Sequence, residues 1–449
     1  MSWTLRVLLC VALATFYVAG SSTHAVRVNR IKSRGDQTGY LIDAKQVYAN
    51  WHGRSPAGLV GERNRMPVYA GVLALFYSPA LSDQAFFERA QQVNIVLSLA
   101  LLAGIWFAAA RYLPPLAAAN LTGVAAFGWF VFKAGYTQSE LLSYTVFFLA
   151  FLACWRLFHA GVERRALTAA AAGVLCGLSQ LTKASMLPFV ALVLAEGAVW
   201  SLAPLFRRTA VHGDSAPRRA ATLLLFALCF LLVVWPYIST SKRVFGHYFY
   251  NVNSTFYVWY DNWPRASVGT ALHGDGQHWP DMPAADLPGP NRYLHEHTAG
   301  QIVARFAGGF QDMGVVLRRD FDLLPYLALY GGMFVLLIGT RRQALSAMAR
   351  DHIWPVTLLA AYAGTYLMAT AFYQPTSGTG TGRFLLAHAL PLFFILSRII
   401  GSARLRATVW EVAGLRVDAM RFHQLVSAVI LFNVAVRVWP RLMQTYGGF

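Results

Sequence analysis

The chain has 449 residues, of which 56% are hydrophobic and only 13% are charged. Soluble domains average roughly 25% charged residues, so this composition excludes an ordinary soluble protein and favours one that crosses a membrane many times. The formal net charge is +18, but the cations are scattered between apolar segments and form no basic run, which argues against a nucleic-acid partner. Such scattered cations instead favour cytoplasmic loops and attraction to anionic lipid headgroups.

Apolar segments predict an all-α polytopic integral membrane protein with about eleven transmembrane helices in a single domain, residues 1–449. Several segments are shorter than the ~20 residues that cross a bilayer core, and the weakest are 167–181 and 425–439. The first segment is alternatively a cleaved signal peptide, because residues 22–25 resemble a cleavage site. In chain order, the predicted spans are 3–20, 92–112, 116–132, 140–158, 167–181, 186–205, 221–238, 323–339, 354–372, 384–400 and 425–439.

The loop charges predict the orientation of these spans. Arginine is concentrated in the loops of one side, whereas the short loops of the other side carry only Lys133, Lys183 and Arg383. The positive-inside rule therefore places two long loops, 21–91 and 239–322, on the non-cytoplasmic side. Because the composition leans towards a bacterial protein, we expect the inner membrane, with these loops facing the periplasm or the cell exterior.

Both long loops are predicted to contain interfacial helices. Apolar residues recur every three or four positions from Tyr40 to Trp51, which predicts a helix that lies in the interface with its apolar face in lipid. Pro67 is expected to begin a second apolar helix that continues to Tyr77. In the later loop, 274–290 is rich in Gly, Pro and Asp and predicts irregular structure, and 300–317 predicts another amphipathic helix.

Asp36 is the strongest candidate for a catalytic group. It lies just after the first apolar segment, beside Arg34, on the side predicted to be non-cytoplasmic. A carboxylate in this place can act as a general base at a membrane face. It can equally cap the helix that follows, because Asp accepts hydrogen bonds from the first backbone N–H groups. Asp43, seven residues later on nearly the same helical face, is a second candidate for orienting a substrate.

Several cations on the same side are candidates for binding a phosphate. Two of them precede the helix predicted at Pro67, where guanidinium donors and the helix N-terminus both favour an anion. Others stand at the outer ends of spans, where charged side chains are costly and often functional, although they also snorkel to headgroups. The candidates are Arg63, Arg65, Lys183, Lys242, Arg243 and Arg383.

Three further features bear on substrate binding. Glu140 begins the fourth span and is expected either to orient a substrate and balance a cation, or to stabilise a helix N-terminus that Ser139 caps. Tyr257, Trp259 and Tyr260 suit stacking on sugar rings, and they suit an aromatic belt at the interface as well. His295 and His297 raise the question of a metal, but no standard zinc spacing is present and none is expected.

The order of these segments resembles the GT-C glycosyltransferase superfamily, in the branch that contains protein O-mannosyltransferases and the lipid A aminoarabinose transferase. Asp36 matches the catalytic Asp early in the first outer loop of that family. The family often has Glu directly after this Asp. This chain has Gln37 there, so it lacks the second acid of the motif. Other similar segments are Arg65-Met66-Pro67-Val68-Tyr69, Ser139-Glu140-Leu141, residues 177–183, 235–237 and 243–246, and Arg383-Phe384-Leu385-Leu386 with Pro391.

The resemblance implies a sugar transfer from a polyprenyl-phosphate donor to a glycan, glycolipid or protein acceptor, with inversion and without a metal or other cofactor. Asp36 would be the base, and Arg63 or Arg65, Lys183 and Arg383 would bind the donor phosphate.

Other functions stay open on the sequence alone. A sugar or lipid transporter or flippase would show inverted repeats and charges in mid-membrane, and neither is evident. An O-antigen ligase-like or polymerase-like enzyme would use Arg243, Arg265, Arg292 or His297 of the later loop and would not need Asp36. A structural membrane subunit without chemistry is the third alternative.

Overall fold

The computed structural model describes residues 3–32, 35–53, 61–159, 164–206, 215–319, 323–377, 382–406, 410–412 and 415–444. The first half contains α1 (Trp3–Val28), α2 (Gln37–Trp51), α3 (Pro67–Ala74), α4 (Asp83–Ala110), α5 (Pro115–Ala125), the π-helical turn η1 (Ala126–Phe130), α6 (Val131–Lys133), α7 (Glu140–Leu157), α8 (Arg165–Thr182), α9 (Leu187–Phe206) and α10 (Ala216–Phe245).

The second half contains α11 (Val252–Thr255), the 3₁₀ turn η2 (Tyr257–Trp259), α12 (Trp263–Val268), the 3₁₀ turn η3 (Ala284–Asp286), α13 (Pro290–Glu296), α14 (Ala299–Arg319), α15 (Leu324–Asp351), α16 (Ile353–Ser377), α17 (Gly382–Ile400), α18 (Ala403–Arg406), α19 (Ala419–Asn433), the π-helical turn η5 (Val434–Val438) and α20 (Trp439–Met443). The strands β1 (Trp410–Val412) and β2 (Leu415–Val417) form a short antiparallel hairpin that pairs Trp410 with Val417.

Among the described residues, eight helices are long and apolar enough to cross a membrane. They coincide with eight of the predicted spans, as expected of an all-α membrane protein. Helices α1, α8 and α9 occupy the other three predicted spans but are not among the eight. The total of eleven therefore stays a prediction. The eight are Asp83–Ala110, Pro115–Lys133, Glu140–Leu157, Ala216–Phe245, Leu324–Asp351, Ile353–Thr376, Gly382–Ile400 and Ala419–Met443.

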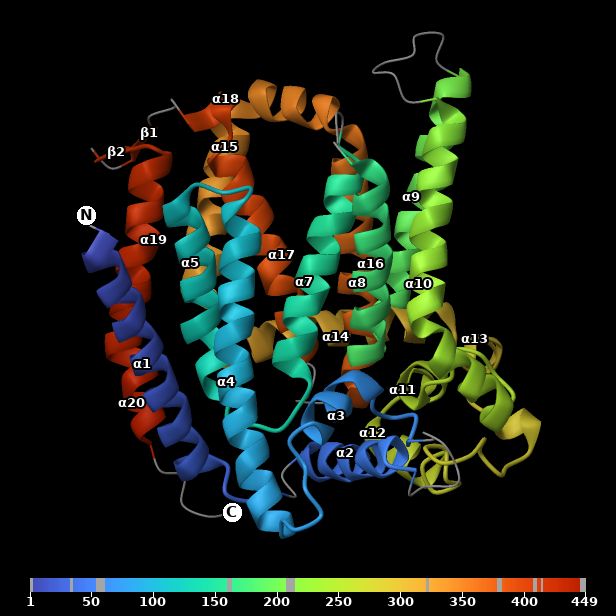
Figure 1. Cartoon of the computed structure of the whole chain (residues 1–449). Coiled ribbons are helices and arrows are strands. Elements are labelled where there is room, and N and C mark those ends of the chain that lie inside the picture. Colours follow the sequence, from blue (N-terminus) through green and yellow to red (C-terminus); the bar gives the residue numbers. More distant parts are fainter. Residues whose placement is uncertain are drawn as a thin grey trace.

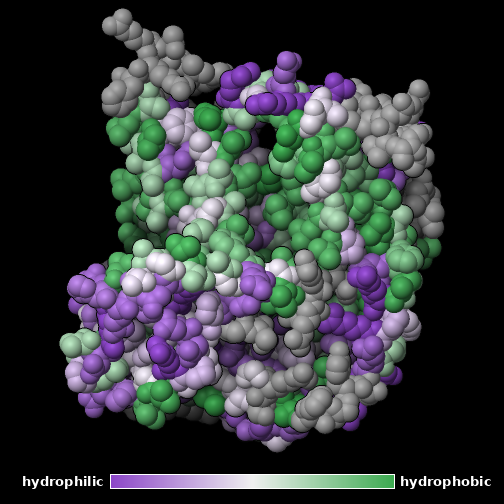
Figure 2. Space-filling view, turned by 180° about the vertical axis from the view of Figure 1, so that it is seen from behind, coloured by the Kyte–Doolittle hydropathy of each residue, from purple (hydrophilic) through white to green (hydrophobic). Residues whose placement is uncertain are grey.

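Both long loops lie at one end of the helix bundle, which we call the loop end. Figure 1 shows α2 and α3 of the first loop beside α11, α12 and α13 of the second, while α18 and the hairpin lie at the opposite end. In Figure 2, apolar side chains gather over the long helices, and hydrophilic ones gather at the loop end and at the opposite end. This distribution is the one that a bilayer around the middle of the bundle requires.

Helices α8 and α10 pack closely because two glycines face α10. A Cβ on Gly173 would lie 2.3 Å from the carbonyl oxygen of Phe226, and one on Gly177 would lie 2.7 Å from Cβ of Val233. Small residues four positions apart allow two helices in a membrane to approach at backbone distance. The contact fixes the end of α8, after which Lys183 follows.

The prediction that the first loop helix turns its apolar face to lipid is wrong. Helix α2 forms where the periodicity predicts it, but Tyr40, Leu41, Ala44 and Val47 are buried against α3 and the first turns of α4. The α3 helix begins at Pro67 as expected and ends at Ala74, before Tyr77. Periodicity identifies an apolar face, but it does not show whether protein or lipid covers that face. The later amphipathic helix is confirmed as α14, and 274–290 is mostly irregular.

Candidate active site

Four charged side chains from distant parts of the chain meet at the loop end. Asp36 directly precedes α2, Glu140 begins α7, Lys183 follows α8 and Arg383 lies in the first turn of α17. Helix α7 packs against both α8 and α17, which brings the last three together. We call these four residues the Asp36 cluster.

The Asp36 cluster is a chain of ion pairs. Nη1 of Arg383 donates to Oδ2 of Asp36 at 2.8 Å and lies 3.5 Å from Oε1 of Glu140. Nζ of Lys183 lies 3.6 Å from the same Glu140 oxygen. The two carboxylates and the two cations thus form one connected group of charges.

The side chains of the Asp36 cluster differ in their exposure to solvent, and this difference indicates different roles. The Glu140 side chain is 4% exposed, whereas those of Asp36 and Arg383 are 40% and 32% exposed. Nε of Arg383 and Oε2 of Glu140 are buried, and neither has a hydrogen-bond partner among the described residues. Glu140 is therefore the inner anchor of both cations, while Asp36 and Arg383 present a carboxylate and a guanidinium to an incoming molecule.

The capping alternatives for Asp36 and Ser139 are wrong. Asp36 occupies the N-cap position of α2, but its side chain makes no capping hydrogen bond and contacts Arg383 instead. Ser139 does not cap α7 with its side chain either, and its Oγ lies 2.7 Å from the hydroxyl of Tyr40.

Aromatic residues that the sequence did not single out support the Asp36 cluster. The hydroxyl of Tyr144 donates to the Arg383 carbonyl oxygen at 2.8 Å and holds the start of α17. The Phe384 ring lies 4.8 Å from Nζ of Lys183 and 5.5 Å from Cζ of Arg383, so it contacts both cations. The sequence suggested no role for Tyr144, and it named Phe384 only as part of the segment Arg383-Phe384-Leu385-Leu386.

Arg65 lies in a second group of charges and makes no recorded contact with Asp36. Its Nε lies 3.0 Å from Oδ2 of Asp43, and its Nη2 lies 2.6 Å from Oε2 of Glu62. Burial raises the pKa of Asp43, and Arg65 opposes that rise. The guanidinium also faces the Tyr40 ring at 6.0 Å. The Arg65 side chain is 13% exposed, against 32% for Arg383, so it is less accessible to a phosphate than Arg383 is.

Gly39 is the residue that lets Arg65 lie on α2. A Cβ at Gly39 would lie 2.1 Å from Cζ of Arg65, so we expect Gly39→Ala to displace the flexible guanidinium from Asp43 and to lose stability relative to Gly71→Ala, because both substitutions gain the same helix propensity. Thermal unfolding of the purified variant measures this loss. The control is Gly71→Ala in α3, where nothing lies within 4 Å of the added methyl group. Equal midpoints for the two variants would contradict the assigned role of Gly39.

Arg63 connects the two long loops and does not join the Asp36 cluster. It is 2% exposed, its Nε donates to Oγ of Ser241 at 3.0 Å, and its guanidinium lies 4.2 Å from the Tyr237 ring. Its carbonyl oxygen accepts from the Val252 N–H at 3.1 Å. Burial lowers the pKa of Arg63. These contacts make Arg63 a structural link between the loops.

Lys242 and Arg243 are exposed in the last turn of α10. Nζ of Lys242 donates to the Gly246 carbonyl oxygen at 2.7 Å, a contact that stabilises the helix end. The structure records no contact of either cation with the Asp36 cluster. Charge spacing in the sequence does not distinguish such end-of-helix cations from Lys183.

The predicted aromatic residues of the second loop divide into two groups. Tyr257 is buried, and its hydroxyl donates to Oδ1 of Asp275 at 3.1 Å. Trp259 and Tyr260 instead line a cavity of about 140 Å³ that we call the loop pocket. Its lining residues are Trp259, Tyr260, Asp261, Arg265, Pro288, Gly289, Arg292, Tyr293, Glu296 and His297.

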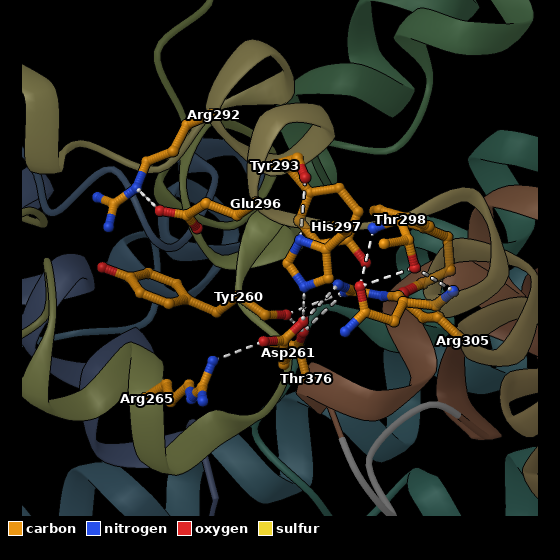
Figure 3. Close-up of polar contacts among 12 residues, drawn as sticks. Tyr260, Asp261, Arg265, Arg292, Tyr293, Glu296, His297, Thr298, Arg305 and Thr376 are labelled. Carbon is orange, nitrogen blue, oxygen red and sulfur yellow. Dashed lines mark hydrogen bonds and ion pairs between the residues drawn. The ribbon is translucent and has the colours of Figure 1, made fainter.

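A polar network forms one wall of the loop pocket (Figure 3). Oδ1 of Asp261 lies 3.0 Å from Nε2 of His297, and Oδ2 accepts from Nη1 of Arg265 at 2.7 Å. His297, considered above as a metal ligand, thus pairs with a carboxylate. Within the described residues, no group of three or more His, Cys, Asp or Glu side chains is placed to hold a metal ion.

No protein-family model, curated protein or solved structure matches this chain. The assignment of a function therefore depends on the chemistry of the Asp36 cluster and of the loop pocket.

Proposed function

We propose that this chain is a membrane glycosyltransferase that transfers a sugar from a polyprenyl-phosphate donor to an acceptor on the non-cytoplasmic face. The observation that supports the proposal is the pair of a partly exposed carboxylate, Asp36, and a partly exposed guanidinium, Arg383, 2.8 Å apart at the loop end. A sugar phosphate linked to a membrane lipid needs both groups, one for the acceptor hydroxyl and one for the phosphate, at the edge of the bilayer.

The cations stabilise the leaving phosphate. Arg383 has a buried Nε without a partner among the described residues, in addition to the Nη1 that binds Asp36. Lys183 lies on the other side of Glu140, so both cations converge on the same carboxylate. As the bond between the anomeric carbon and the phosphate oxygen breaks, the electron pair leaves with the phosphate, and these cations stabilise its negative charge.

Asp36 accepts the proton of the acceptor. The Asp36 carboxylate takes the proton from the acceptor hydroxyl while the acceptor oxygen bonds to the anomeric carbon. Attack from the face opposite the phosphate inverts the anomeric configuration. The products are the glycoside, the polyprenyl phosphate and a protonated Asp36, which returns its proton to water.

The decisive experiment reconstitutes the protein in liposomes with a polyprenyl-phosphate sugar and a mixture of glycan and peptide acceptors. We expect polyprenyl phosphate to be released together with a new glycosidic bond. Movement of the intact donor across the bilayer, with no glycoside formed, would identify a transporter or flippase and reject the proposal.

Lys183 predicts how donor binding depends on pH. Burial lowers the pKa of Lys183 to about 8, against the opposing effect of Glu140. Lys183 is therefore charged below that pH and loses its proton above it, so kcat/KM for the donor is expected to fall as the pH rises through about 8. Because Arg stays charged in this range, Lys183→Arg is expected to remove the fall. A profile that is identical in both proteins would show that Lys183 does not bind the donor.

One observation favours a second candidate, an O-antigen ligase-like or polymerase-like enzyme whose chemistry lies in the second loop. Arg265, Arg292 and His297, predicted for that alternative, all line the loop pocket, although Arg243 does not. The two candidates differ in what they require. The ligase-like enzyme keeps its activity in Asp36→Asn and loses it in Arg292→Ala, whereas the enzyme proposed here loses it in Asp36→Asn.

A further inference from the structure

The loop pocket combines flat aromatic walls with paired charges. Trp259, Tyr260 and Tyr293 supply the rings, and Arg265, Arg292 and Glu296 supply charged groups. Figure 3 shows the Arg292 guanidinium and the Tyr260 ring pointing to the same side, with Arg265 on the other side of that ring. Aromatic faces beside hydrogen-bonding groups that point in one direction are characteristic of a binding site for a small polar ring.

Side chains behind the loop pocket hold its aromatic wall in place through hydrogen bonds to backbone carbonyl oxygens. Nη2 of Arg305 donates to the carbonyl oxygens of Val258 and Tyr260 at 3.0 Å each, and Oγ1 of Thr376 donates to the Tyr260 carbonyl at 2.6 Å. The Thr270 N–H donates to the Tyr260 hydroxyl at 2.9 Å. The Tyr260 ring is therefore fixed at both ends, which lowers the entropy lost when a ligand binds.

The charges inside the loop pocket balance. Nη1 of Arg265 bonds Asp261 at 2.7 Å, and Nε of Arg292 bonds Glu296 at 2.7 Å. Each guanidinium has five N–H groups and each carboxylate has several lone pairs, so both pairs retain donors and acceptors for a ligand. Arg305, behind the wall, also lies 3.6 Å from Asp261 and is not among the lining residues. The donors and acceptors of two lining ion pairs match the hydroxyl groups of a neutral sugar better than they match a phosphate or a carboxylate.

The loop pocket and the Asp36 cluster lie on two sides of the same turn of α16. The Phe372 ring lies 5.8 Å from that of Trp259 and 5.3 Å from that of Tyr293. The next residue, Tyr373, faces the other way, with its ring 5.6 Å from that of Phe384. Phe384 contacts both cations of the Asp36 cluster. A ligand in the pocket is therefore separated from the Asp36 cluster by a turn of α16 and the side chains of Phe372, Tyr373 and Phe384, so only an acceptor of several sugar units reaches both.

We propose that the loop pocket binds a neutral sugar ring of the acceptor, so that the acceptor is a glycan or glycolipid and not an unmodified polypeptide. This inference rests on the proposed function, because only a transferase needs an acceptor beside Asp36. Sugar binding itself does not require transfer, and the two are tested separately.

The first test measures binding to the full-length protein in lipid nanodiscs by saturation-transfer NMR. The probes are methyl α-D-mannopyranoside, methyl β-D-glucopyranoside, D-glucuronate and a short Ser/Thr peptide. Wild type and Asp36→Asn are expected to bind the neutral glycosides, and Arg292→Ala is expected to bind them about tenfold more weakly because it loses charge-assisted hydrogen bonds. The matched control is His295→Ala, an exposed residue of α13 that does not line the pocket.

The second test separates the acceptor from the donor in the liposome assay. Arg292→Ala is expected to raise KM for a glycan acceptor, whereas His295→Ala, outside the pocket, is expected to leave that KM unchanged. Preference for glucuronate or for the peptide, no glycoside binding to wild type, or equal binding by Arg292→Ala and His295→Ala would each overturn the inference. If transfer is absent while these binding results hold, the proposed function fails and the sugar site stands.

Discussion

Asp36→Asn is expected to reduce sugar transfer by about 10²–10⁴-fold, the usual contribution of a general base. Asn has nearly the same size as Asp and keeps an oxygen that can accept from Arg383, but it cannot take a proton from the acceptor. The ion pair that is lost is partly exposed, at 40% for Asp36 and 32% for Arg383. Exposed pairs contribute about 0–1 kcal/mol, so folding is expected to survive. The measurement is kcat for glycoside formation in liposomes, together with the thermal midpoint.

Asp83→Asn is the matched control for this prediction. Asp83 is also an exposed carboxylate at the loop end, where it pairs with Lys32 and Lys45. We expect this variant to transfer sugar at the wild-type rate. If both variants keep full activity, Asp36 is not the base and the proposed mechanism is rejected.

Arg383→Ala is expected to have the second large effect, a loss of about 10²–10³-fold in rate, as for removal of a donor that stabilises charge in a transition state. The substitution also removes a partner of Glu140, which is only 4% exposed and would keep Lys183 alone. A buried carboxylate that loses a partner destabilises a protein, so we expect the thermal midpoint to fall as well.

Arg383→Lys separates the two effects. Lys keeps the positive charge near Glu140 but lacks the planar set of donors that binds a phosphate through two oxygens. We expect it to restore most of the stability and only part of the rate, with a raised KM for the donor. Arg243→Ala, which removes an exposed cation of α10, is expected to change neither the thermal midpoint nor the rate. Full activity in Arg383→Ala would show that the phosphate binds elsewhere.

Hydropathy and charge patterns predicted most of the fold. Helices form at all the predicted spans because a stretch of apolar residues in a bilayer must satisfy its backbone hydrogen bonds internally. The number of helices that cross the membrane was harder to predict. Helix α8 is positioned by the packing of Gly173 and Gly177 against α10 more than by its own hydropathy. Packing of this kind depends on which helices are neighbours, and the sequence does not state that.

The sequence predicted the members of the Asp36 cluster singly, from their positions at the ends of spans. That they meet at one site was predicted only through the family resemblance, which also placed Arg65 there. Charge spacing alone cannot give this pairing, because 347 positions separate Asp36 from Arg383 and the packing of α7 against α8 and α17 is what brings Glu140, Lys183 and Arg383 together. Arg65 was predicted to join the same site, but the structure places it in a different group of charges. Its phosphate-binding motif looked as favourable as Arg383, but in the fold it pairs with Asp43 and Glu62, away from Asp36, and is only 13% exposed.

The short bond between Asp36 and Arg383 implies an order of events. While it is intact, Oδ2 of Asp36 accepts from Nη1 of Arg383 and is not available to the acceptor hydroxyl. A donor phosphate that binds Arg383 competes for the same N–H groups and so frees the base only when the sugar is in place. Substrates would then enter in a compulsory sequence, the lipid-linked sugar before the acceptor, and an enzyme without its donor would be unreactive towards acceptor hydroxyls.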